Sequence, residues 1–226
     1  MTSKRKKAMR SFVIRDCALS AIATGRQAQN LRELRDLLRT VHPDSIYYHF
    51  WGGLLRPRLD DPEYNNDFAV WAAHGLHDER LAERLAIIDP TDYGDLEQLR
   101  SDLLDAVEER LDESEYVPWS SVDNQFAFIR SQIVVFHTHR RLHHPAELVE
   151  ITPHFSLGSI FFHVIDARRR TPDGVDDFHG WLRDLGDAYG PLCEELTGID
   201  PYFTTLAGIR QNLSGVFRKH LGEGKS

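Results

Sequence analysis

The stretch Ser45-Ile46-Tyr47-Tyr48-His49 recurs 114 positions later as Ser159-Ile160-Phe161-Phe162-His163. Further matches lie on both sides of it, with small changes of offset after the histidines: Glu33-Leu34 with Glu147-Leu148, Asp67-Phe68 with Asp177-Phe178, Trp71 with Trp181, and Ile88-Asp89-Pro90 with Ile199-Asp200-Pro201. A repeat of this length is far longer than the 20 to 50 residues of a solenoid unit. The sequence therefore predicts a tandem duplication of roughly 110 residues.

The apolar residues follow helical spacing through most of the chain. Leu31, Leu34, Leu37 and Leu38 follow the spacing of one helix face, with Asn30 before them as a helix cap. Comparable patterns predict helices over residues 47–55, 67–74, 81–88, 95–112 and 205–221. We predict an all-α fold, in which a four- to five-helix unit is duplicated in tandem and packed with pseudo-twofold symmetry, with one or two short strands as the exception.

One region is ambiguous between helix and strand. Residues 126–136 are rich in aromatic and β-branched side chains, which favour strands. The equivalent part of the first copy, residues 18–23, is rich in alanine and favours helix. We predict helix in both copies and keep a short strand as the alternative.

The same comparison divides the chain into five segments. Residues 1–10 form a basic tail that we expect to be disordered, and residues 222–226 form a second tail. The two helical repeats occupy residues 11–112 and 123–221, and a linker of residues 113–122 joins them. Whether the repeats form one core or two domains stays open.

Composition excludes some classes of function. A net charge of −8 disfavours a nucleic-acid binder, because binding to phosphates requires a basic face. No apolar stretch is long enough to span a bilayer, and two cysteines without a disulfide framework favour reduced thiols in the cytoplasm. The sequence contains no H-E-x-x-H, C-x-x-C, G-x-S-x-G or G-x-G-x-x-G pattern, so it leaves open whether the protein is an enzyme.

Three short patterns carry a resemblance to known sequences. They are Leu31-Arg32-Glu33-Leu34, Tyr47-Tyr48-His49 and Asn66-Asp67-Phe68-Ala69-Val70-Trp71. With them, the chain from about Phe12 to Leu221 resembles a bacterial and archaeal family of uncharacterised proteins, and each copy resembles a small stand-alone helical module. The second copy departs from the pattern at Pro145 and Asp176. The resemblance implies a helical fold, and it does not indicate a function.

The polar residues that recur with the repeat are His49, Asp67 and Trp71, matched by His163, Asp177 and Trp181. A histidine on one helix facing an aspartate at the start of another would pin the two helices together. The aspartate could instead cap its own helix. As a third interpretation, His49, Asp67, His163 and Asp177 could together bind a divalent metal such as zinc, iron or manganese.

Two further polar groups are candidates for a site. The first copy carries a polar fringe of Asn65, Asn66, His74 and His77 that the second copy has largely lost, so a site confined to one half is expected there. The second copy carries a histidine cluster, and His139 and His143 would share one helix face at a spacing that suits a metal: His137, His139, His143 and His144. A solvated helix face is the alternative interpretation of the fringe.

The aromatic run Tyr47, Tyr48, Phe50 and Trp51 surrounds more than half of a helix. It requires either a central helix or a cover supplied by the other copy or a partner. We therefore expect a non-enzymatic interaction or scaffold module in the cytoplasm that binds a protein partner or self-associates. The alternative is a metal- or small-molecule-binding helical protein, including a metalloenzyme, that uses the repeated His/Asp pairs.

Overall fold

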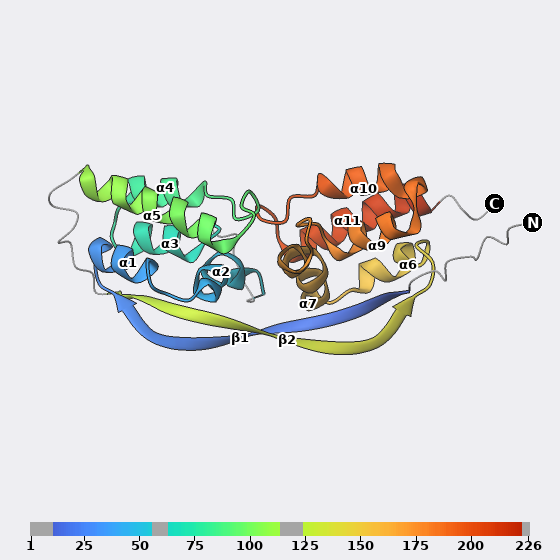
Figure 1. Ribbon diagram of the computed structural model, residues 1–226, viewed down its shortest axis with the longest axis horizontal. Coiled ribbons are helices and arrows are strands. Elements are labelled where there is room, and N and C mark those ends of the chain that lie inside the picture. The colour runs from blue at the N-terminus through green and yellow to red at the C-terminus, as the bar shows by residue number, and fades with distance from the viewer. Residues whose placement is uncertain (1–10, 56–62, 114–123, 223–226) are drawn as a thin grey trace, which may run out of the picture. The chain divides into compact units, whose positions relative to one another are not determined.

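The computed structural model describes residues 11–55, 63–113 and 124–222. Most of these residues are helical, which confirms the predicted class at this level. Two strands, β1 (Phe12–Ala28) and β2 (Phe126–Leu142), pair as a two-stranded antiparallel sheet (Figure 1). The predicted tails and linker fall almost entirely outside the described ranges.

Both strands occupy stretches for which we predicted helix, so that prediction was wrong. The first residues of each strand alternate between the core and the surface, with Phe12, Ile14, Phe126 and Phe128 buried. The alanine-rich part of β1 has the local preference of a helix, but pairing with β2 outweighs it.

Side chains of the strands contribute to the pairing. Thr24 Oγ1 donates to the carbonyl of Phe128 at 2.6 Å, and Thr138 Oγ1 donates to that of Ile14 at 2.6 Å. From Ile14 to Thr24 the chain advances ten residues along β1, while the contacted residue moves back ten positions along β2, from Thr138 to Phe128. This is the register of an antiparallel pair.

The chain forms two compact units that are not continuous in sequence. The N-terminal unit comprises Ala18–Val134, and the C-terminal unit comprises Met1–Cys17 together with Val135–Ser226. Each strand therefore begins in one unit and ends in the other. The units differ from the expected repeats because the first residues of β1 pack with helices that follow β2.

The N-terminal unit packs its helices around leucine and phenylalanine side chains. The helix α5 lies against α1, α2 and α4, and α3 lies against α4. Apolar residues of α1, α3 and α5 are fully buried there, among them Leu34, Phe68 and Leu103. The helices of this unit are α1 (Leu31–Leu38), α2 (Pro43–Trp51) with a 3-10 turn (Gly52–Leu55), α3 (Asp67–His74), α4 (Glu79–Ala86) and α5 (Leu96–Asp112).

In the C-terminal unit α11 takes the central place and contacts α6, α7 and α10. A π-helical stretch, Phe161–Asp166, joins α7 to α8. The helices are α6 (Glu147–Ile151) with a 3-10 turn (Thr152–His154), α7 (Leu157–Ile160), α8 (Ala167–Arg170), α9 (Asp177–Leu185) with a 3-10 turn (Asp187–Tyr189), α10 (Gly190–Thr197) and α11 (Leu206–Leu221). No helix in the described parts of the chain is both long and apolar enough to cross a membrane.

The start of α1 agrees with the cap expected from the sequence, and three other helices start at caps of the same kind. Asn30 Oδ1 accepts the N–H of Glu33 at 2.9 Å, and Asn66, Asp95 and Thr205 cap α3, α5 and α11. The aromatic run on α2 is buried, as is every residue from Ser45 to Trp51. Of the two arrangements considered for this run, a central helix or a cover from elsewhere, the structure has the central helix.

Candidate functional site

A serine and a histidine on one helix of each unit hold the backbone of a strand. In the N-terminal unit, Ser45 and His49 lie four residues apart on α2 and so share a face. Ser45 Oγ donates to the carbonyl of Ile129 at 2.7 Å, and the N–H of Ile129 donates to His49 Nε2 at 3.1 Å. Both backbone groups of one strand residue are therefore bound by one helix.

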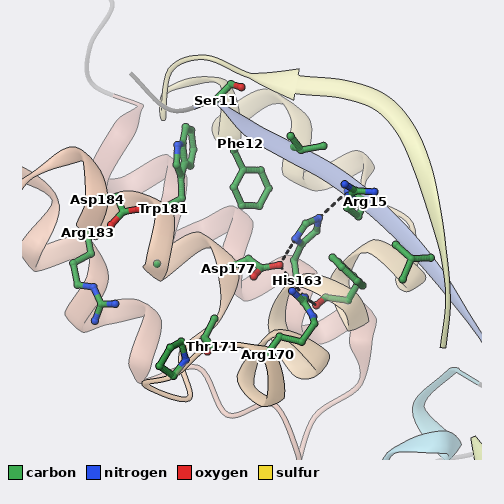
Figure 2. Close-up of a pocket in the computed structure, with 15 residues that line it drawn as sticks. Ser11, Phe12, Arg15, His163, Arg170, Thr171, Asp177, Trp181, Arg183 and Asp184 are labelled. Carbon is green, nitrogen blue, oxygen red and sulfur yellow. Dashed lines mark hydrogen bonds and ion pairs between the residues drawn. The ribbon is translucent and has the colours of Figure 1, made fainter. Parts of the chain in front are cut away.

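The C-terminal unit makes the same pair of contacts. Ser159 Oγ donates to the carbonyl of Arg15 at 2.8 Å. The N–H of Arg15 donates to His163 Nε2 at 2.9 Å (Figure 2). Isoleucine and arginine have little in common, so the contact depends on the backbone and not on the side chain. We call each serine–histidine pair a strand clamp: Ser45 with His49, and Ser159 with His163.

An aspartate orients each clamp histidine. His49 Nδ1 lies 2.8 Å from Asp67 Oδ2, and His163 Nδ1 lies 2.8 Å from Asp177 Oδ2. Because Nε2 accepts a backbone N–H, the ring proton of a neutral imidazole lies on Nδ1 and is donated to the carboxylate. Both ring nitrogens are therefore engaged, and both histidines are buried.

The electrostatics of Asp177 fit this role. Burial alone would raise the pKa of Asp177, but hydrogen bonds from His163 and Arg170, with the positive charge of Arg170, outweigh it and lower that pKa. Asp177 therefore stays ionised at neutral pH. Asp67 and Asp177 are also the first residues of α3 and α9, where the helix dipole favours a negative charge.

A phenylalanine of the strand anchors the backbone beside each clamp. The ring of Phe126 lies 4.7 Å from that of His49, 5.0 Å from Phe68 and 5.6 Å from Trp71, measured between centroids. Trp71 also donates its indole N–H to the carbonyl of Asn124 at 2.7 Å. The strand is thus held by one aromatic side chain and by two hydrogen bonds to its backbone, and a third hydrogen bond holds the residue two positions before it.

Phe12 has the matching position in the C-terminal unit. Its ring centroid lies 4.9 Å from that of His163, 5.0 Å from Phe178 and 5.2 Å from Trp181. The repeated residues predicted from the sequence therefore form two local sets, one in each unit. Sequence reasoning named neither the serines nor the phenylalanines as site residues, although Phe12 and Phe126 also lie 114 positions apart.

The polar fringe of the first copy is dispersed. Asn66 is buried as the cap of α3 and donates its side-chain N–H to the carbonyl of Leu85 at 2.9 Å, and Asn65 precedes it. His74 lies at the other end of α3, and both it and His77 are exposed. These four residues do not meet in one place.

The histidine cluster of the second copy does not form the expected helix face. His137 and His139 lie in β2, whereas His143 and His144 follow it, so the helical spacing of His139 and His143 was wrong. Within the described ranges no three side chains of His, Cys, Asp or Glu are grouped so that they could hold a metal ion. His49 and Asp67 belong to one unit, and His163 and Asp177 to the other.

A pocket of about 810 Å³ opens beside the clamp of the C-terminal unit (Figure 2). Phe12, Phe162 and Trp181 supply aromatic surface, and Asp177 reaches it from the clamp. Three arginines also line the pocket: Arg15, Arg170 and Arg183. From the sequence we expected that a site confined to one half would lie in the first copy. This pocket lies in the unit that contains the helices of the second copy.

Comparisons with known proteins support the fold and supply no activity. No protein with a curated description matches the chain. The structure of OrfY from Thermoproteus tenax is similar over 95% of this chain and 97% of that chain, with a TM-score of 0.81 and 24% identity, which shows the fold alone. A family model described as a family of unknown function, DUF5752, matches residues 9–218, and the chain therefore belongs to that family, as the resemblance predicted.

Proposed function

We propose that this protein is a non-enzymatic interaction and scaffold module made of two copies of a helical unit, each of which grips an extended segment by its backbone. In this chain the grip is occupied by the protein's own strands. The observation that carries the proposal is that each clamp binds both the N–H and the C=O of a single strand residue.

The contacts support a duplication in which the strand ends are exchanged. Positions 114 residues apart make the same contacts: Phe12 and Phe126, Arg15 and Ile129, Thr24 and Thr138, Ser45 and Ser159, His49 and His163. The strand residues 12–17 precede the first set of helices but pack with the second set. A pseudo-twofold relation between two copies accounts for both observations.

The engagement of the clamp histidines favours this function over catalysis or metal binding. A general base needs a free nitrogen within reach of a substrate, and a metal ligand needs a free lone pair. In both clamps one ring nitrogen contacts an aspartate and the other accepts a backbone N–H. The metal-binding alternative would require these contacts to break.

The partner that suits such a clamp is an extended protein segment with a phenylalanine three residues before the clamped position, from another protein or from a second copy. The negative net charge of the chain disfavours nucleic acid. Both cysteines are free and buried, which agrees with a reducing compartment, and we place the protein in the cytoplasm.

Peptide complementation tests the grip directly. A chain that begins at Ala18 lacks the strand segment bound by the C-terminal clamp, and we expect it to melt at a lower temperature than the full chain. A synthetic peptide of residues 9–19 should restore the melting temperature in a saturable manner, because a ligand at 100 times its Kd stabilises by about 2.7 kcal/mol. The same peptide with Phe12→Ala is the matched control and should have little effect.

Metal analysis separates the rival function. We expect untagged protein to contain no stoichiometric metal by elemental analysis and His163→Ala to lose thermal stability. Stoichiometric metal that disappears in His163→Ala, together with no response to the wild-type peptide, would replace the scaffold function with the metal-binding one.

A further inference from the structure

The pocket of the C-terminal unit carries positive charge that the strand clamp does not use. Arg15 contributes its backbone to the clamp, while its side chain lines the pocket. Its Nη1 lies 2.9 Å from Nδ1 of His137. Across the described ranges, no carboxylate lies within ion-pair distance of this guanidinium.

The other two arginines of the pocket differ in how firmly they are held. Arg170 is fixed, because it donates to Asp166 at 2.8 Å and to the carbonyl of Phe162 at 2.8 Å, and its guanidinium lies 4.0 Å above the Phe162 ring. Arg183 pairs with Asp173 at 2.7 Å on the surface, where both side chains are about half exposed. An exposed pair of this kind is weak, so Arg183 can turn to a ligand at little cost.

The carboxylates near the pocket pair with two of its three arginines. Arg170 contacts Asp166 and Asp177, and Arg183 pairs with Asp173. Asp177 also contacts His163, and its lowered pKa reflects the stabilisation of its negative charge. Asp184 is the other acid of the lining. Arg15 is therefore the arginine of the lining that has no ion pair with a described carboxylate.

Six further residues of the lining are apolar or aromatic: Phe12, Val13, Val135, Phe162, Pro172 and Trp181. A volume of about 810 Å³ is within the usual range for small-molecule sites. An arginine fork beside an aromatic wall suits a ligand with an anionic end and an apolar body.

The N-terminal unit has uncharged residues at the places that match two of these arginines, Arg15 and Arg183. Ile129 occupies the position of Arg15, and Ala73 occupies that of Arg183. The clamp is common to both units, but this combination of charge and aromatic surface belongs to one of them. The charged side chains of the pocket are therefore not part of the contacts that the clamp requires.

We propose that this pocket binds a small organic anion, a carboxylate or phosphate carried on an aromatic or similar apolar group, with Arg15 as its principal counter-charge. The ligand's apolar body would pack against the aromatic wall that includes Phe162, and its anionic end would face Arg15. This binding is independent of the proposed scaffold function, because the side chain of Arg15 takes no part in the clamp.

Calorimetric titration of the full chain with benzoate and phenyl phosphate tests the proposal, with benzyl alcohol and inorganic phosphate as the two halves of the ligand tested alone. We expect saturable binding of at least one aromatic anion, and binding at least about tenfold weaker for each half. A difference between benzoate and phenyl phosphate identifies the anionic group. No saturable binding of either up to 10 mM, on the order of −2.7 kcal/mol, would overturn the proposal, and so would equal binding of inorganic phosphate.

Two matched variants locate the site. Arg15→Ile introduces the residue found at the same place in the other unit and keeps the backbone contacts of the clamp. It should lower the affinity for the aromatic anion by about tenfold or more. Arg141→Ile removes the same charge from an exposed position of β2 outside the pocket and should leave binding within about twofold. Equal loss in both variants, or no loss in Arg15→Ile, would show that the anion does not bind in this pocket. Unchanged melting of Arg15→Ile keeps this result separate from any failure of the clamp.

Discussion

The two units share their contacts with the strands and differ in nearly everything around them. Each has a serine and a histidine that bind the backbone, an aspartate that orients the histidine, and a phenylalanine packed beside it. Yet the helix that carries His49 is α-helical, whereas His163 lies in a π-helical stretch. The two units thus make the same clamp contacts from helices of different kinds.

The caps of the helices that carry the clamp aspartates also differ. Asn66 is neutral and uses both its oxygen and its nitrogen, whereas Asp176 accepts the N–H of His179 at 2.8 Å and is only 5% exposed. Burial raises the pKa of Asp176, with the hydrogen bond from the backbone opposing it. The two cap residues can therefore be exchanged between the units as an experiment.

Removal of an anchoring phenylalanine is expected to have the largest effect on stability. Phe126→Ala deletes a buried ring that packs against four other rings, and Phe12→Ala deletes one that packs against three. We expect each change to lower the free energy of unfolding by about 3–5 kcal/mol. Chemical denaturation followed by circular dichroism measures the loss. Similar losses would support equivalent roles of the two phenylalanines. A loss below about 1 kcal/mol in either variant would show that the two do not have equivalent roles.

Replacement of a clamp histidine comes next. His49→Ala and His163→Ala each leave a strand N–H without its acceptor and remove the hydrogen bond from the histidine to its aspartate, although Asp177 keeps its contact with Arg170. Each change should cost about 1–3 kcal/mol. His154→Ala, at an exposed position, should change stability by less than about 0.5 kcal/mol. Hydrogen exchange at the N–H groups of Ile129 and Arg15 should rise only in the unit that is altered.

The helices of both units were the predictable part of the fold, for local reasons. Asn30 and Asn66 mark helix starts within one turn of the chain, and leucine spacing defines α5 and α11 without reference to other segments. The strands were missed because their stability is not local. Residues 18–23 prefer helix by composition, and their extended conformation depends on pairing with residues more than 100 positions away.

The clamp was predictable only in part. The repeat identified His49 and His163, and the type of the neighbouring residues favoured a contact with Asp67 and Asp177. Which strand residue meets Nε2 depends on how the strand lies across the helix, and a single sequence contains no local signal for that. The 114-residue spacing of Phe12 and Phe126 was a usable signal, because a repeated phenylalanine outside the helical pattern indicates a repeated contact.

Exchange of the buried caps should have a smaller effect and a definite pH dependence. The raised pKa of Asp176 means that its ionised form is disfavoured in the folded protein, so stability is lost as the pH rises through that pKa. Asp176→Asn, which introduces the residue of the other unit, should therefore stabilise the protein at pH 7 by about 1 kcal/mol. The gain should shrink below about pH 4, near the unfolded pKa of aspartate. The reverse change, Asn66→Asp, should destabilise at pH 7, and thermal melts from pH 3 to 8 measure both.

The smallest expected effect concerns a matched pair of backbone positions in the strands. Gly25 has φ +73° and His139 has φ +60°, and each follows a threonine that bonds across to the other strand. Glycine adopts this left-handed region freely, whereas a side chain is strained there, as at the first residue of a β-bulge. His139→Gly should therefore stabilise by about 0.5–1 kcal/mol, and Gly25→Ala should destabilise by about 1 kcal/mol, although no atom lies within 4 Å of the added Cβ. Melting temperatures that change in the same direction for both variants would show that the two strands do not share this conformation, and the correspondence between the units would then stop at the clamps.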